Sequence, residues 1–112
     1  MTMFNQNDIN LLIQIIPIGR QNAIIARVIA QRLGYPVGGN QVKARRLIDF
    51  AIDNGNVILS SSGRIPKGYW ISTNRQETID YIASLRNRAN EITERADNLR
   101  TGWNTINQNN QI

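Results

Sequence analysis

The segment GNQVKARRLIDFAIDNG, residues 39–55, predicts a helix that lies between two glycines. Its apolar residues recur at helical spacing and form one stripe, which consists of Ala44, Leu47, Ile48 and Ala51. Its cations lie in the first half, whereas Asp49 and Asp53 lie in the second half. This polarity fits either a solvated surface helix or a helix whose first half meets an anionic partner.

The positive charge of the chain is concentrated in residues 1–74. They contain eight Lys and Arg side chains against three Asp, a net charge of +5, whereas residues 75–112 contain five Arg against five acidic side chains. A charge excess confined to one small module is typical of proteins that bind a polyanion such as nucleic acid. The distribution therefore favours an anionic partner.

Length and composition limit the class of protein. A chain of 112 residues has room for one domain with a modest core and one further element. No apolar run approaches the roughly 20 residues of a membrane span, and the N-terminal MTMFNQND lacks the order of a secretion signal. We therefore expect a cytoplasmic protein without a membrane partner, and the absence of Cys agrees with a reducing compartment.

The residues that usually carry catalysis are missing. The chain has no His and no Cys, so the common general base, the thiol nucleophile and the usual zinc ligands are absent. It also lacks a glycine-rich phosphate-binding loop. We expect no enzymatic activity, no cofactor and no metal site.

Two further helices are expected before residue 39. NDINLLIQIIP, residues 7–17, has apolar residues at helical spacing and ends at Pro17. ARVIAQRLG, residues 26–34, has Gly34 as its stop, and the apolar run at residues 23–25 before it could pair as a strand. Asn40 is a plausible N-cap for the helix that follows.

A hairpin and a long helix are expected after residue 55. VIL, residues 57–59, and YWI, residues 69–71, flank a Ser, Gly and Pro-rich tip that carries Arg64 and Lys67. Asn74 and Glu77 have the spacing of a capping box for a helix that runs to about Thr101.

This order of elements resembles the winged helix-turn-helix family, in particular small biotin-repressor-like proteins of phages and mobile elements. The resemblance rests on AIIARVIAQRLG, VKARRLIDFAIDNG, VILSSS and GYWIS in that order. It implies a mainly α fold with a small β-hairpin, a winged helix domain at residues 1–73, a C-terminal helix at 74–103 and a disordered Asn/Gln-rich tail at 104–112. Two features differ from the family: Ile25 replaces the usual Ser or Thr N-cap, and the linker 34–40 is long.

The resemblance implies sequence-preferring binding of double-stranded DNA by a phage-type transcriptional regulator or replication accessory factor in a bacterial cytoplasm. The helix of residues 39–55 would enter the major groove. Arg45 or Arg46 would read guanine, Gln41 adenine and Val42 a thymine methyl group. The expected phosphate contacts are Asn40 and Lys43. Arg64 and Lys67 on the wing would reach the DNA backbone or an adjacent minor groove.

An alternative use of the same fold is a protein-interaction module, such as a phage inhibitor of a host nucleic-acid machine. The basic face would then meet an acidic protein or a bound nucleic acid. A further alternative for Arg45 and Arg46 is that they are solvated side chains on an ordinary surface helix.

The long helix carries a heptad seam, which consists of Ile82, Leu85, Ala89, Ile92, Ala96, Leu99 and Trp103. This spacing favours a coiled coil over packing of the helix on its own domain. A homodimer is the first choice because repressors of this family commonly use two half-sites. Arginines flank the seam at positions 86, 88, 95 and 100, so a helical partner with acidic flanks is the rival interpretation.

Overall fold

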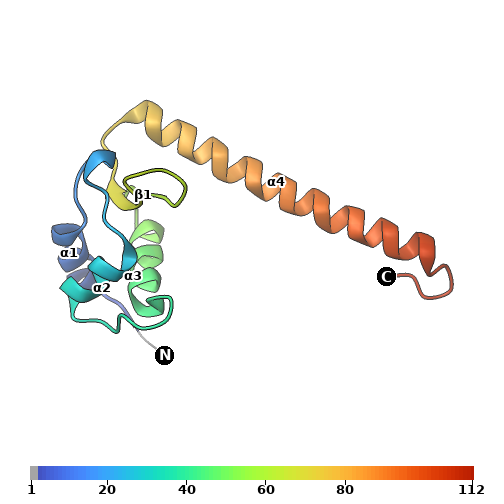
Figure 1. The fold of residues 1–112 in the computed structure, drawn as a ribbon, viewed down its shortest axis with the longest axis horizontal. Helices are drawn as coiled ribbons and strands as arrows, with labels where there is room; N and C mark the ends of the chain where they lie inside the picture. Colours follow the sequence, from blue (N-terminus) through green and yellow to red (C-terminus); the bar gives the residue numbers. More distant parts are fainter. Residues whose placement is uncertain (1–2) are drawn as a thin grey trace. The chain divides into compact units, whose positions relative to one another are not determined.

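The computed structural model describes residues 3–112, and its contacts divide the chain into two units at the Thr78–Ile79 boundary. In the described residues the fold is mainly helical, with one two-stranded antiparallel hairpin and a long C-terminal helix, as the sequence predicted (Figure 1). In chain order the elements are α1 (Gln6–Ile15), the short 3-10 helix η1 (Arg20–Asn22), α2 (Ala26–Leu33), α3 (Val42–Asp53), β1 (Ile58–Ser61), β2 (Gly68–Ile71) and α4 (Arg75–Ile106).

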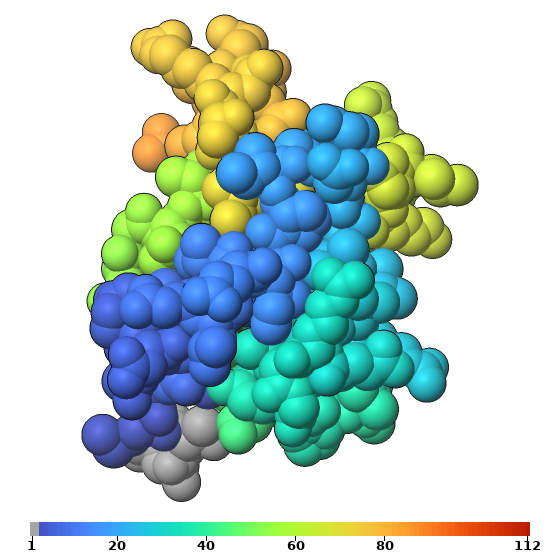
Figure 2. Space-filling model, turned by 90° about the vertical axis from the view of Figure 1, so that its left-hand side faces the viewer, coloured from blue at the N-terminus to red at the C-terminus, as the bar shows by residue number. Residues whose placement is uncertain are grey.

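The core of the first unit lies between α1, α2 and α3. Each helix contributes a narrow apolar stripe, and the largest fully buried side chains of these stripes are Ile9, Leu12, Ile29, Leu47 and Ile48. The stripe expected on residues 39–55 is buried in full, because Ala44 and Ala51 are as inaccessible as the larger residues beside them. Figure 2 shows α1 and the segment around α2 side by side on one face of this unit.

The start of α1 is closed by a reciprocal pair of hydrogen bonds. The Asn5 side chain accepts from the backbone N–H of Asp8 at 3.1 Å, and the Asp8 carboxylate accepts from the backbone N–H of Asn5 at 2.8 Å. These bonds satisfy two donors that the helix leaves unpaired. The helix ends before Pro17, as predicted.

β2 is paired along both edges. On one edge it pairs with β1 in an antiparallel register that sets Leu59 opposite Trp70. On the other edge the backbone of Tyr69 exchanges two hydrogen bonds with Ile24, of 2.7 and 3.1 Å, and Ile71 N–H donates to the Pro17 carbonyl at 2.8 Å. The apolar run expected as a strand at residues 23–25 is therefore one isolated bridge.

Gly68 allows this second edge to approach. Its φ is +121°, and a Cβ atom at this position would lie 2.1 Å from the carbonyl oxygen of Ile24. Any other residue would push β2 away from Ile24.

The start of α3 differs from the sequence prediction. The N-cap is Gln41, in the left-handed conformation with φ 51°, and its side chain makes no capping bond. Its amide instead donates to the carbonyls of Val37 at 2.8 Å and Gly39 at 2.9 Å. The prediction that Asn40 caps α3 is wrong, because the long linker closes on the Gln41 side chain and begins the helix one residue later.

The first turn of α4 is attached to the hairpin. Asn74 caps it as expected and accepts from Glu77 N–H at 2.9 Å. The backbone N–H of Asn74, which would complete a capping box, donates to the Ser72 hydroxyl at 3.3 Å. The Glu77 carboxylate accepts from the Trp70 indole N–H at 2.8 Å and from the Ser72 hydroxyl at 3.1 Å. Glu77 therefore joins the start of α4 to the buried Trp70 of β2.

The C-terminal end of α4 extends past the boundary expected at residue 103. The helix continues to Ile106, and the chain then turns back. The indole N–H of Trp103 donates to the Asn110 carbonyl at 2.7 Å, and the backbone N–H of Ile112 donates to the Asn104 side chain at 2.8 Å. None of the described helices is both long and apolar enough to cross a membrane.

Candidate nucleic-acid interface

The first half of α3 presents one exposed face opposite the core. Val42, whose side chain is 54% exposed, and Arg46 are four residues apart and lie above the buried Ala44 and Leu47. The arrangement follows from helical periodicity, because a residue two positions before or after Ala44 lies on the opposite side of the helix from the apolar stripe. This face offers one methyl-rich and one guanidinium group to a partner.

Arg45 is held by two intramolecular hydrogen bonds. Its Nε donates to the Asn40 carbonyl at 2.6 Å, and its Nη1 donates to the Tyr69 hydroxyl of β2 at 3.0 Å. The guanidinium therefore joins the loop before α3 to the hairpin. In this conformation it is a positioning residue, and Arg46 is the better candidate for a bidentate contact with a base.

The loop between α2 and α3 engages two more of the predicted contact residues. Lys43 Nζ lies 4.1 Å from the centre of the Tyr35 ring, a cation–π distance. Burial raises the pKa of the Tyr35 hydroxyl above 10.0, and the Asp8 carboxylate raises that pKa further. The Gln41 amide donates to two backbone carbonyls, so its remaining oxygen is an acceptor only. Asn40 is exposed in the same loop.

The wing cations lie together on the loop that joins β1 and β2. Arg64 and Lys67 are both exposed, and between them Ile65 is 92% exposed. Figure 2 shows this loop, in yellow-green, projecting from the body of the first unit. A projecting loop with two cations can follow a phosphate backbone.

Arg20 is a structural cation that the sequence did not single out. Its guanidinium lies 5.3 Å from the centre of the Trp70 ring, and its Nη2 donates to the Ser61 hydroxyl at 3.3 Å. Arg20 thus supports the hairpin at Trp70 and at the loop end of β1. It lies in η1, which at three residues is too short for a periodicity, so no local pattern could have indicated this contact.

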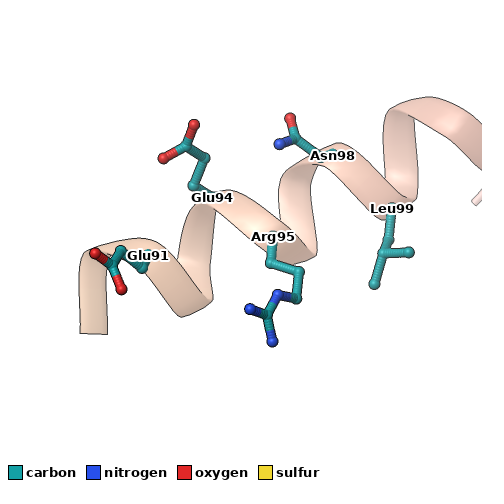
Figure 3. A pocket seen from close by; sticks show the side chains of 5 residues that line it. All are labelled: Glu91, Glu94, Arg95, Asn98 and Leu99. Carbon is teal, nitrogen blue, oxygen red and sulfur yellow. The ribbon is translucent and has the colours of Figure 1, made fainter. Parts of the chain in front are cut away.

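The heptad seam of α4 is exposed throughout. None of the residues of α4, all of which the structure describes, is buried, and the exposed fractions include 65% for Ile92 and 70% for Leu99. One shallow hollow on this helix is lined by Glu91, Glu94, Arg95, Asn98 and Leu99, and Figure 3 shows the Arg95 and Leu99 side chains on the same side of the helix. A second hollow is lined by Ile79, Ile82, Ala83, Arg86 and Asn87.

Within residues 3–112, no group of three or more His, Cys, Asp or Glu side chains could hold a metal ion. Comparison with known proteins found no family model, no curated protein and no solved structure that matches this chain. Its function is therefore inferred from its residues and their geometry.

Proposed function

We propose that this chain binds double-stranded DNA with a winged helix-turn-helix, in which α3 is the recognition helix and the β1–β2 hairpin is the wing. The observation that carries this proposal is the exposed face of α3, with Val42 and Arg46, in a unit that holds the whole charge excess of the chain. Pairing of Ile24 with β2 supports it, because the hairpin is thereby fixed to the segment before α2.

The proposed mechanism separates affinity from sequence preference. Arg64 and Lys67 contact phosphates, with Lys43 and Asn40 adding contacts at the start of α3, and release of counterions drives the binding. Arg46 donates two hydrogen bonds to guanine, and Val42 packs against a thymine methyl group. Arg45 keeps the wing and the recognition helix in register through Tyr69.

The biological role we propose is that of a phage-type transcriptional regulator or replication accessory factor in the cytoplasm of a bacterial host. Binding would act by occupancy of a DNA site. The seam of α4 would assemble the protein on a second helix, either another copy or a partner with acidic flanks.

A second candidate function is supported by the apolar residues among these cations. Ile65 at the tip of the wing and Val42 on α3 are exposed. An exposed apolar side chain beside a cation is also typical of a surface that binds another protein. In this case the unit would be an interaction module that binds an acidic protein of a nucleic-acid machine.

A fluorescence-anisotropy salt titration with a random DNA duplex tests the proposal. With about four to six phosphate contacts for each copy, we expect log K to fall with log salt at a slope of about −4 to −5. Arg64→Ala with Lys67→Ala should reduce the magnitude of the slope by about 2. The matched control, Arg86→Ala with Arg88→Ala on α4, should leave it unchanged. Absence of binding at low salt overturns the proposal and favours the interaction module.

A further inference from the structure

The seam of α4 is large enough to form a stable interface. Its eight members are Ile82, Leu85, Ala89, Ile92, Ala96, Leu99, Trp103 and Ile106, the last of which joins the heptad because the helix continues to Ile106. All eight are exposed, up to 83% for Ile106. These fractions correspond to roughly 700–800 Å² of seam for each copy, close to the ~800 Å² that one partner of a standard interface buries.

Small and large residues are distributed unevenly along the seam. With Ile82 at position a of the heptad, the small residues Ala89 and Ala96 occupy two successive a positions, while every d position is Leu or Ile. A parallel pair of these helices would set each alanine against the same alanine of its partner. Two layers of the core, one on each side of the Ile92 layer, would then hold only methyl groups and would be underpacked.

An antiparallel pair removes this defect, because each a position then faces a d position of the other copy. In the register that pairs all eight members, Ala89 faces Leu99 and Ala96 faces Ile92. The same register sets Leu85 opposite Trp103 and Ile82 opposite Ile106. Trp103 is suited to this place, since its indole N–H already donates to Asn110 and the ring surface remains for packing.

The charges on the helix oppose self-association only weakly. The acidic residues of the second unit all lie on the back of the helix, whereas Arg86, Arg88, Arg95 and Arg100 flank the seam. In the antiparallel register, Arg95 lies near Arg95 of the other copy. Arg86 lies near Arg100 of the other copy. These groups are exposed and screened by salt, Glu91 lies one turn before Arg95, and Arg100 Nε donates to the Ile112 carbonyl. Burial of the seam outweighs this repulsion.

We infer that α4 binds α4 of a second copy of this chain as an antiparallel two-stranded coiled coil, with Ala89 packed against Leu99 of the other copy. The symmetry axis passes near residue 94, so the N-terminal ends of the two helices lie at opposite ends of the coiled coil. The Thr78 residues of the two copies then lie roughly 48 Å apart along the coiled coil. Where the proposed function holds, this pairing places one DNA-binding unit at each end.

Disulfide mapping tests the orientation, and the natural chain contains no cysteine that could interfere. The full-length variants Ala89→Cys and Leu99→Cys are mixed in a glutathione redox buffer. We expect the disulfide between the two different variants to exceed its statistical share of about half, because Ala89 lies ~15 Å along the axis from Ala89 of the other copy, beyond disulfide reach. Predominance of the Ala89→Cys self-disulfide, or a statistical mixture, overturns the inference.

Sedimentation equilibrium of the wild-type chain supplies the second test. We expect dimers at tens of micromolar that tighten about two- to fivefold as salt rises, because salt screens the flanking arginines. Arg95→Ala should tighten the dimer, and Ile92→Asp with Leu99→Asp should give monomers. A wild-type monomer at every salt concentration overturns the inference; binding to an acidic heptad peptide or to anionic vesicles would then identify the occupant. Neither test uses DNA, so failure of DNA binding leaves both results intact.

Discussion

Arg45 of α3 donates a hydrogen bond from Nη1 to the Tyr69 hydroxyl of β2, at a distance of 3.0 Å. The two residues are 24 positions apart, and their contact connects the helix proposed to read DNA with the strand that supports the wing. Arg45 also donates from Nε to the Asn40 carbonyl. The Arg45 guanidinium therefore fixes the position of the loop before α3 and of the hairpin relative to α3, and we assign it no contact with a base.

Removing the Arg45–Tyr69 contact should cost a small, coupled amount of stability. In urea denaturation, the double variant Arg45→Ala with Tyr69→Phe should lose about 0.5–1 kcal/mol less stability than the sum of the two single losses. This coupling energy is low because the pair is exposed. Arg46→Ala, on the free face of α3, should change stability by less than ~0.5 kcal/mol. Additive losses for Arg45 and Tyr69 would contradict the positioning role.

Arg46 and Lys43 should differ in how they affect DNA recognition. On a selected DNA site Arg46→Ala should cost about 1–3 kcal/mol and relax the preference at one base pair. Lys43→Ala should weaken all sequences about equally, since a phosphate contact carries no sequence information. Competition binding against single-base variants of the site measures both. Identical effects on every sequence would show that α3 does not read bases as proposed.

The acceptor provided by Glu77 should be required for stability. Glu77→Ala leaves the indole N–H of Trp70, a residue only 2% exposed, without its acceptor and should cost about 1–3 kcal/mol. Glu77→Gln keeps a carbonyl oxygen at this place and should lose less stability than Glu77→Ala. Urea denaturation in a Trp103→Phe background reports on Trp70 fluorescence alone.

The matched control for Glu77 is Glu94→Ala in the middle of α4. Glu94 is exposed, so this change should alter stability by less than ~0.5 kcal/mol. Equal losses for Glu77→Ala and Glu94→Ala would show that the contact between Glu77 and Trp70 contributes nothing.

Gly68 should be the least replaceable glycine of the hairpin. Gly68→Ala would drive its Cβ against the Ile24 carbonyl and should cost more than about 2 kcal/mol, because a positive φ and a backbone clash act together. In Gly63→Ala, in the same hairpin, the new Cβ meets no atom within 4 Å, so this variant should keep the stability of the wild-type chain. Thermal unfolding compares the two variants, and similar melting temperatures would contradict the close approach of β2 to Ile24.

The sequence alone determined the helices, because their signals are local. Helical spacing of apolar residues placed Leu47 and Ile48 in the core, and Pro17 marked a helix end through its own covalent geometry. The exposed position of Arg46 followed from the same periodicity. DNA binding remains a prediction from charge and resemblance.

Only the tertiary structure decided the hydrogen-bond partners of three polar side chains, those of Gln41, Arg45 and Glu77. The start of α3 at Val42 is set by the Gln41 side chain and two carbonyls of the preceding loop. The role of Arg45 is set by Tyr69, and the partner of Glu77 is Trp70 rather than its own helix end. No periodicity encodes these contacts, since the energy of a polar side chain depends on which donor or acceptor folding brings within about 3 Å of it.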